Sequence, residues 1–169
     1  MAITAGDIDF HLSGGAGNAD PDAALGGVIS ATQLTDASLH NLFDIVSSAE
    51  ASAGDTEYRC IYVKNAHGSL ALENAVVWIQ TQTPSDDTSV EIALAGEGVN
   101  GTAETVANES TAPVGETFSA PADLGSGLAI GNIPAGQHQA IWIKRIVGAA
   151  ATAYNSDSVV IRVQGDTAA

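Results

Sequence analysis

The sequence predicts an all-β protein: an antiparallel β-sandwich, of jelly-roll or immunoglobulin-like type, with one short helix. After Glu57, apolar and polar residues alternate with the two-residue period of β-strands. Clusters of Gly, Pro, Asn and Asp separate these runs, as in sandwiches built from short strands. Only one stretch of the chain carries the i, i+3, i+4, i+7 spacing of a helix.

The first third of the chain is less regular. We expect residues 1–56 to form an arm with short strands and a short helix that packs on the core. Asp7–Leu12 alternates and predicts a strand, and Val28–Thr32 predicts a second short one. A helix of about ten residues needs a sheet to lie against, because it is not stable alone. The helical i, i+3, i+4, i+7 spacing falls on Leu39, Leu42, Phe43 and Val46, and Thr35 or Asp36 is the expected N-cap.

Residues 57–169 are expected to form the sandwich core, in a single domain with the arm. We expect its strands in Tyr58–Lys64, Leu72–Thr83, Thr88–Ala95, Gly127–Ile133, Gln137–Val147 and Ser158–Gln164. The stretch Thr102–Ser126 is weakly patterned, with a candidate edge strand near Glu116–Ser119. Asn100-Gly101 indicates a tight turn of the hairpin kind.

Aromatic residues mark the centre of this core. Trp78 and Trp142 each lie between β-branched neighbours, as is typical of central strands. We interpret both, with Tyr58 and Tyr62, as anchors of the core or of an interface with a neighbouring copy; ligand stacking by the tryptophans is the alternative. Cys60 is the only cysteine, so an intrachain disulfide is excluded and a small buried hydrophobic residue is expected.

Charge limits the classes of partner. The chain has 20 acidic and five basic residues, a net charge of -15. An acidic surface argues against binding to a nucleic-acid backbone and against docking on anionic membranes, so we expect neither partner. The basic residues lie in or beside the apolar runs and are candidates for charge-assisted contacts to an acidic neighbour: Arg59, Lys64, Lys144, Arg145 and Arg162.

Catalytic, cofactor-binding and metal-binding patterns are not found in the sequence. The segment Asn18–Asp22 starts like a calcium loop, but Ala23 and Ile29 stand where the loop needs Gly and Glu, so we predict an acidic turn. Gly14–Gly17 lacks the Lys and Ser/Thr of a phosphate loop. The histidines lack zinc spacing and are expected to be surface or interface polar groups: His11, His40, His67 and His138. We therefore predict no enzyme, no cofactor and no metal.

Two segments, Glu57–Ile79 and Ile130–Lys144, resemble immunoglobulin-like modules. In these modules a Val-x-Asn strand end and a Pro-x-Gly turn before a long strand recur, here at 63–65 and 134–136. With Leu12–Asn18 and Asn41–Asp44, the whole chain resembles small structural proteins of tailed bacteriophages. The resemblance implies a virion component, most often a capsid decoration (cement) protein and sometimes a tail or fibre part.

From this resemblance we expect a non-enzymatic protein that stabilises the phage head by bridging subunits of the major capsid protein. The expected partners are that capsid protein and copies of this chain, as a trimer. Met1–Asp7 has no basic or apolar region of a signal peptide, and no run of 18 apolar residues occurs. We therefore expect assembly in the host cytoplasm and a final position on the capsid exterior.

Two alternatives stay open: a tail or fibre component, and a carbohydrate-binding β-sandwich module. The irregular segment Ala2–Ser30 is expected to reach a partner, because weakly patterned chain ends become ordered against another surface.

Overall fold

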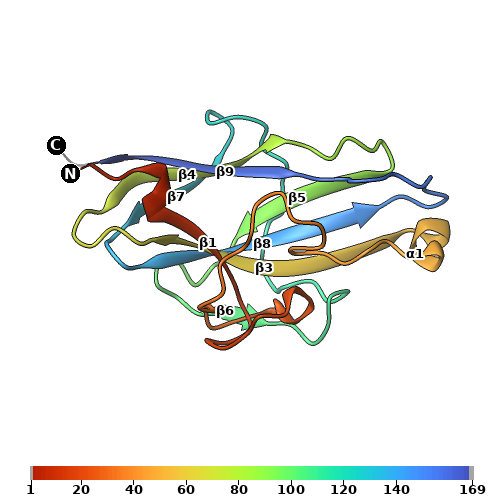
Figure 1. The fold of residues 1–169 in the computed structure, drawn as a ribbon, viewed down its shortest axis with the longest axis horizontal. Coiled ribbons are helices and arrows are strands. Elements are labelled where there is room, and N and C mark those ends of the chain that lie inside the picture. The colour runs from red at the N-terminus through yellow and green to blue at the C-terminus, as the bar shows by residue number, and fades with distance from the viewer. Residues whose placement is uncertain (1, 168–169) are drawn as a thin grey trace.

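The computed structural model describes residues 2–167, which form three antiparallel sheets (Figure 1). The four-stranded sheet has the order β1 (Ile8–Leu12), β3 (Asp55–Asn65), β8 (His138–Val147), β5 (Thr88–Leu94). The three-stranded sheet has the order β7 (Leu128–Ile133), β4 (Leu72–Thr81), β9 (Val160–Thr167). A short pair joins β2 (Gly26–Gly27) to β6 (Ala103–Thr105). The predicted all-β sandwich with one short helix, α1 (Ser48–Ala53), is confirmed; two 3-10 turns, Ala5–Asp7 and Pro21–Ala23, complete the elements.

The sandwich core lies between the four-stranded and three-stranded sheets. Strand alternation builds it, since every second residue of β3 and β8 points to the same face. Ile61 lies opposite Ile141 across the β3–β8 ladder, and both pack against Val77 and Ile79 of β4 in one buried cluster. These residues are 0–3% exposed, so their burial is complete.

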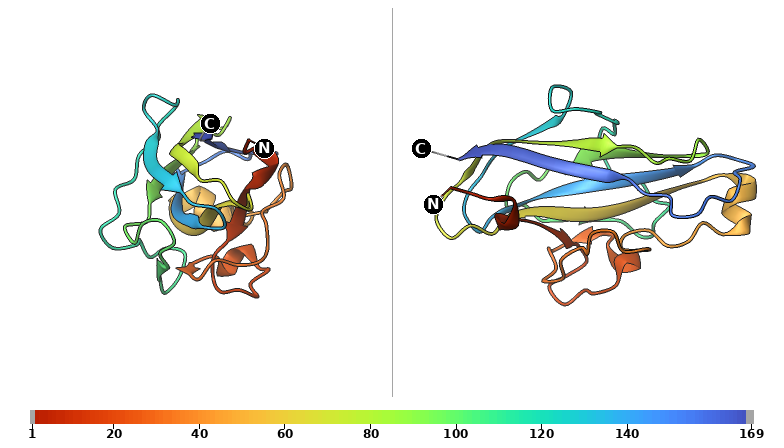
Figure 2. Two further views of the ribbon diagram at one scale, coloured as in Figure 1. Left: turned by 90° about the vertical axis from the view of Figure 1, so that its left-hand side faces the viewer. Right: turned by 45° about the horizontal axis from the view of Figure 1, so that its top comes forward.

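A second apolar layer covers the outer face of the four-stranded sheet. Cys60 and Trp142 are opposite each other on β3 and β8, and they pack with Ala103 and Val106 of the β6 region. The β2–β6 pair and its loops lie on this side, away from the three-stranded sheet (Figures 1 and 2). Gly26 permits this arrangement, because a Cβ at its position would collide with the carbonyl oxygen of Glu104. The molecule therefore has three layers rather than two.

Both edges of the four-stranded sheet are covered by the chain itself. Beside β1, the N–H of Leu12 donates to Thr32 O at 3.0 Å, and the N–H of Leu34 donates to Phe10 O at 2.8 Å. Beside β5, Ile92 and Ser119 exchange backbone hydrogen bonds of 2.8 and 3.0 Å. Covered edges prevent uncontrolled pairing with other chains.

Two short strands expected in the irregular regions take other forms. The candidate edge strand near Glu116–Ser119 is reduced to the single bridge at Ser119. In place of Val28–Thr32, strand β2 forms at Gly26–Gly27, and a further bridge joins His11 to Gln33.

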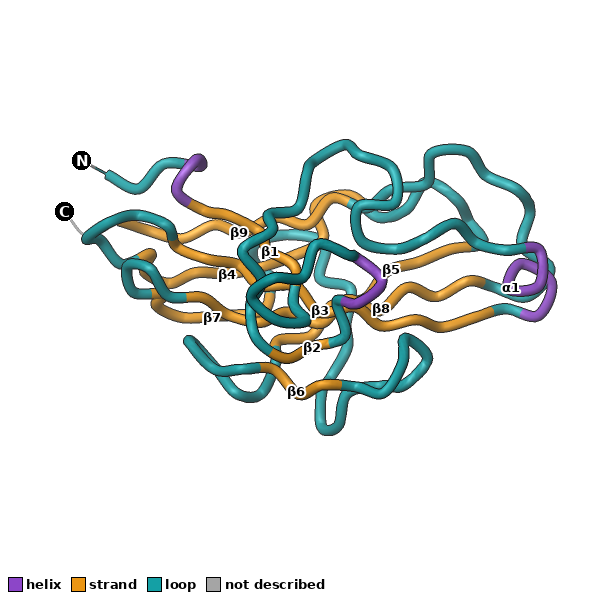
Figure 3. The backbone as a smooth tube through the Cα atoms, turned by 60° about the horizontal axis from the view of Figure 1, so that its bottom comes forward, coloured by secondary structure: helices purple, strands orange, loops and turns teal. Residues whose placement is uncertain are grey.

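The helix predicted on Leu39, Leu42, Phe43 and Val46 is wrong. Residues 35–47 form turns and irregular backbone (Figure 3). Ala37 and His40 adopt φ values of 55°, a left-handed conformation that interrupts an α-helix. Leu39 is 69% exposed, so its place in the apolar pattern does not correspond to burial.

The short helix lies just after this segment. It begins after Ser47, whose hydroxyl accepts from the N–H of Glu50, while the Glu50 carboxylate accepts from the N–H of Ser47. This reciprocal capping box compensates the free N–H groups of the first turn. The helix ends at Gly54, with φ 79°, immediately before β3.

The tight turn at Asn100-Gly101 does not close a hairpin between neighbouring strands. Asn100 has φ 62°, as a tight turn requires, but β6 after it pairs with β2 and not with β5. The turn therefore directs the chain from the four-stranded sheet into the outer layer.

The segment Ala2–Ser30, expected to reach a partner, is largely engaged within the molecule. Its strand β1 pairs with β3 from Ile8 to Leu12, and Ala24 is completely buried. Deleting residues 2–30 would therefore remove part of the core as well as any contact surface. Among the described residues there is no helix with the length and apolar character needed to span a bilayer.

Candidate functional site

Most of the buried charge of the molecule gathers in one place beside the α1 end of β3 and β8. We call it the ion-pair cluster; it consists of Asp22, Asp44, Glu57, Arg59, Glu109 and Arg145, with the ring of Phe43. Glu57 and Arg59 lie two residues apart on β3, and Arg145 is opposite Glu57 on β8. The three acids that complete the cluster come from loops.

Arg59 is fully buried and connects two loops to β3. Its Nη2 donates to Glu109 Oε2 at 2.5 Å and to Asp22 Oδ1 at 3.3 Å. A buried guanidinium without partners is strongly destabilising, since the charge has left water. The two carboxylates therefore hold the segments around residues 22 and 109 against the edge of β3.

Arg145 joins the buried carboxylate of Glu57 to the segment that precedes α1. It pairs with Glu57, donates to the carbonyl oxygen of Asp44 at 2.7 Å, and reaches Asp44 Oδ1 at 3.2 Å. The ring of Phe43 lies 4.8 Å from the Arg145 guanidinium and 5.5 Å from that of Arg59, within cation–π range. Phe43 is thus held by two cations rather than by a helix face.

The basic residues that were candidates for contacts to an acidic neighbour mostly have partners within the chain. Arg59 and Arg145 pair as described above, and Lys144 Nζ lies 2.9 Å from Glu91 Oε2. Arg162 lies over the ring of Trp78 at 5.7 Å, and Lys64 is opposite Asp9 and His138 in the sheet register. The Arg59 side chain is fully buried and that of Arg145 is 12% exposed, and both guanidinium groups are used in pairs within the chain. Contacts of these residues to a neighbour stay a prediction.

The outer layer contains a second polar group, centred on Tyr62. Its hydroxyl donates to Gly27 O at 2.6 Å and accepts from the N–H of Ala103 at 2.9 Å, so it joins β2 and β6 to β3. Burial raises the pKa of Tyr62 to about 12. The ring of His138 meets Tyr62 edge-on at 4.8 Å. Tyr62 is therefore an anchor of the outer layer.

The histidines do not form a metal site or a catalytic pair. His11 is 5% exposed, so its expected surface position is wrong; its Nδ1 lies 2.9 Å from Ser30 O. Burial lowers the pKa of both His11 and His138. His67 Nδ1 accepts from two backbone N–H groups of its turn, and His40 is exposed.

Neither tryptophan lies between the two main sheets. Trp142 is fully buried, but in the outer layer. Trp78 alternates with Val77 and Ile79, which occupy the sandwich core, so its side chain lies on the outer face of β4, where it is 6% exposed. Tyr58 also faces the outer layer, where it meets Phe118 edge-on at 5.5 Å.

The acidic segment Asn18–Asp22 is a structural turn. Asp20 caps the 3-10 turn by accepting from the N–H of Asp22 at 3.1 Å, and Asn18 accepts from the N–H of Asp20 at 2.9 Å. Cys60 is completely buried, and burial raises the pKa of its thiol. The segment Asn18–Asp22 is therefore the acidic turn, and Cys60 the small buried residue, that the sequence predicts.

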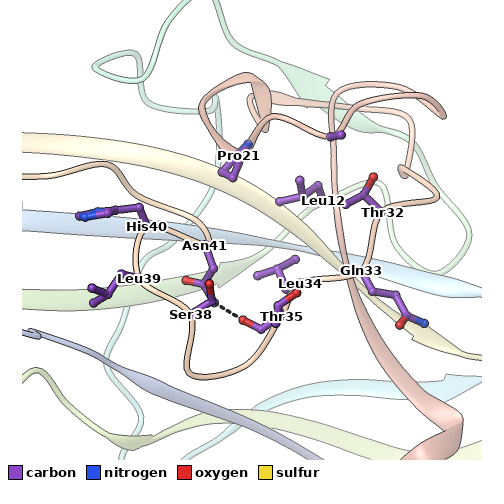
Figure 4. Close-up of a pocket in the computed structure, with 11 residues that line it drawn as sticks. Leu12, Pro21, Thr32, Gln33, Leu34, Thr35, Ser38, Leu39, His40 and Asn41 are labelled. Carbon is purple, nitrogen blue, oxygen red and sulfur yellow. Dashed lines mark hydrogen bonds between the residues drawn. The ribbon is translucent and has the colours of Figure 1, made fainter.

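Two hollows of the described surface are small. One of about 180 Å³ is lined by residues 32–35 and 38–41 with Leu12, Ala19 and Pro21, and the Asn41 amide donates to Thr35 O there at 2.9 Å (Figure 4). The other, of about 160 Å³, lies between the N-terminal segment and Val163–Gly165 of β9. Pockets for small ligands usually enclose about 300–1,000 Å³. Neither hollow is lined by an acidic residue, a lysine or an arginine.

In comparisons with protein families, curated proteins and solved structures, no match was found.

Proposed function

We propose that this protein is a non-enzymatic structural component of a virus particle. In this proposal it is a capsid decoration protein that stabilises a phage head by bridging subunits of the major capsid protein. It acts on the capsid exterior, together with copies of itself as a trimer, after assembly in the host cytoplasm. The proposal rests on the resemblance to phage structural proteins and on the geometry of one loop.

That loop comprises residues 35–47, which we call the contact loop. It presents Leu39 and Ile45, which are 69% and 70% exposed, on either side of Phe43. Phe43 and Asp44 are held by the ion-pair cluster, so the backbone between the two apolar side chains is anchored. An anchored loop loses little conformational entropy when it binds. This combination of large exposed apolar side chains and a rigid base carries the proposal.

The surface chemistry supports a macromolecular partner over a small ligand. The hollows are small and neither is lined by an acidic residue, a lysine or an arginine, which favours contact through loops over enclosure of a ligand. Tyr154 is the one strongly exposed aromatic residue in the described part of the chain, whereas carbohydrate-binding platforms need several. The glycan-binding alternative therefore has less support than assembly.

The test is co-production with the major capsid protein of the same genome, followed by isolation of particles and cryo-electron microscopy. We expect the protein to co-sediment and to occupy regular positions on the head. Changing Leu39 and Ile45 together to Ser should abolish attachment, while circular dichroism and Tm stay unchanged. Val114→Ser is the matched control, because Val114 is 80% exposed on a different loop.

Three results would contradict the proposal. One is a protein that stays monomeric in light scattering and never co-purifies with particles. Another is density confined to the tail, which would support the tail or fibre alternative. A double Ser variant that binds as well as the parent would exclude the contact loop as the attachment surface.

A further inference from the structure

Three carboxylates of the ion-pair cluster converge on one point. Asp44, Glu57 and Glu109 each place an oxygen within 4.8 Å of the oxygens of the other two. They come from the contact loop, from β3 and from the loop after β6, which are far apart in the sequence. An ion bound by all three would therefore connect three segments of the fold.

The carboxylate of Glu57 lacks a full set of partners. Its side chain is 1% exposed and one oxygen is paired with Arg145, but Oε1 has no hydrogen-bond partner. A buried carboxylate oxygen without a donor is costly, because it has lost water without gaining a replacement. The neighbouring carboxylates increase this cost: burial first, and then the charges of Glu109 and Asp44, raise the pKa of Glu57, whereas Arg145 lowers it.

The charges of the cluster do not balance. Its four carboxylates carry −4 and its two guanidinium groups, of Arg59 and Arg145, carry +2, which leaves −2. Each arginine holds carboxylates in position without neutralising the group as a whole. One divalent cation would supply the missing charge and a partner for Glu57 Oε1.

We propose that Asp44, Glu57 and Glu109 bind one Ca²⁺ ion. Calcium prefers oxygen ligands at about 2.3–2.6 Å, so two of its ligands can lie up to about 5.2 Å apart, which accommodates this group. Magnesium holds its water shell more tightly and demands a smaller octahedron, and zinc prefers nitrogen and sulfur ligands. The Asp44 and Glu109 side chains are 47% and 41% exposed, so the ion can enter from solvent and keep water as further ligands.

Bound calcium would stiffen the contact loop, because Asp44 is a ligand and adjoins Phe43. It would also join that loop to β3 and to the segment around Glu109. The proposal does not depend on a virion role, since it rests only on the geometry of the cluster.

The test is calorimetric titration of the full chain, first treated with EDTA, with CaCl2. We expect a Kd of about 10⁻⁴–10⁻³ M, the weak end of the calcium affinities that proteins show. At tenfold excess of calcium over Kd, Tm should rise by about 3–6 °C. Asp44→Asn and Glu109→Gln should each weaken binding about tenfold or more, since affinity follows the number of charged ligands.

Asp86→Asn is the control, because Asp86 is exposed and outside the cluster. Circular dichroism verifies that each variant is folded; Gln at position 109 and Asn at position 44 keep an oxygen that can accept from Arg59 and from Arg145. Absence of both heat and a Tm shift at calcium concentrations of about 10 mM would overturn the proposal, since this exceeds the expected Kd range. An equal response to MgCl2, or unchanged binding in both cluster variants, would overturn it as well.

Discussion

Replacing Arg145 by Met tests whether the ion-pair cluster stabilises the fold. The substitution removes the partner of Glu57, both contacts to Asp44 and one of the two cations over Phe43. Glu57 is 1% exposed, so its carboxylate would be left buried and unpaired. Breaking a buried pair in this way destabilises by about 3–5 kcal/mol. Glu57→Leu alone should cost less, because Arg145 keeps its contacts to Asp44.

The double variant Glu57→Leu/Arg145→Met separates the ion pair from its packing. Apolar replacement of a buried pair is often close to neutral, so the two changes should be strongly coupled, by about 2–3 kcal/mol. Urea unfolding followed by tryptophan fluorescence, in EDTA, measures each free energy, and equal m-values verify that the same transition is compared. A cost below about 1 kcal/mol for Arg145→Met, or additive effects, would refute this reasoning.

Three further expectations follow from the outer layer. Trp142→Ala should lower the free energy of unfolding by about 3–5 kcal/mol in urea titrations, and Trp78→Ala by less, because Trp78 lies outside both apolar clusters. Tyr62→Phe should cost about 1–3 kcal/mol in the same assay, since the buried Gly27 O and Ala103 N–H lose their partner. The pKa values of His11 and His138 are lowered in the folded protein. As the pH falls, these residues therefore take up protons in the unfolded chain before they do so in the folded protein. Their stabilisation is therefore present above pH ~6.5 and lost as the pH falls through the folded-state values. His11→Gln and His138→Gln should flatten Tm against pH in this window, and exposed His40→Gln should not.

The strands could be predicted because their signal is local. Alternation in Tyr58–Lys64 assigns Cys60 and Tyr62 to one face and Ile61 and Val63 to the other, and the structure agrees. Alternation cannot say which face meets the second sheet when both faces are apolar. On β4, Val77 and Ile79 face the sandwich core, and Trp78 between them faces away from it.

The helix and the outer layer could not be predicted, since distant residues determine them. Phe43 has helical spacing to its neighbours, but its strongest partners are Arg59 and Arg145, from two strands that follow it in the chain. The outer layer is built from single apolar residues such as Ala103 and Val106, which have no period.

Part of the ion-pair cluster was visible in the sequence. Glu57 and Arg59 stand two residues apart on one strand, so both share a face, and buried charged residues need partners of opposite charge. Glu57 finds its partner, Arg145, on the neighbouring strand. Their loop partners were not visible: Glu109 is 50 residues from Arg59, and Asp44 is 101 residues from Arg145. Two charged residues spaced two positions apart on a strand indicate a cluster, but they do not identify the loops that complete it.

The internal use of the basic residues determines how this protein can associate. Arg59, Lys144 and Arg145 pair with carboxylates of the same chain, so the exterior is dominated by the remaining acidic groups of a chain with net charge -15. Two such exteriors repel each other, and salt screens the repulsion beyond about 10 Å at 0.1 M. In the proposed assembly, contact between copies therefore comes from exposed apolar side chains and should strengthen with salt. Contact with a basic shell surface should weaken with salt. The opposite salt dependence of the two contacts follows directly from the placement of three basic side chains.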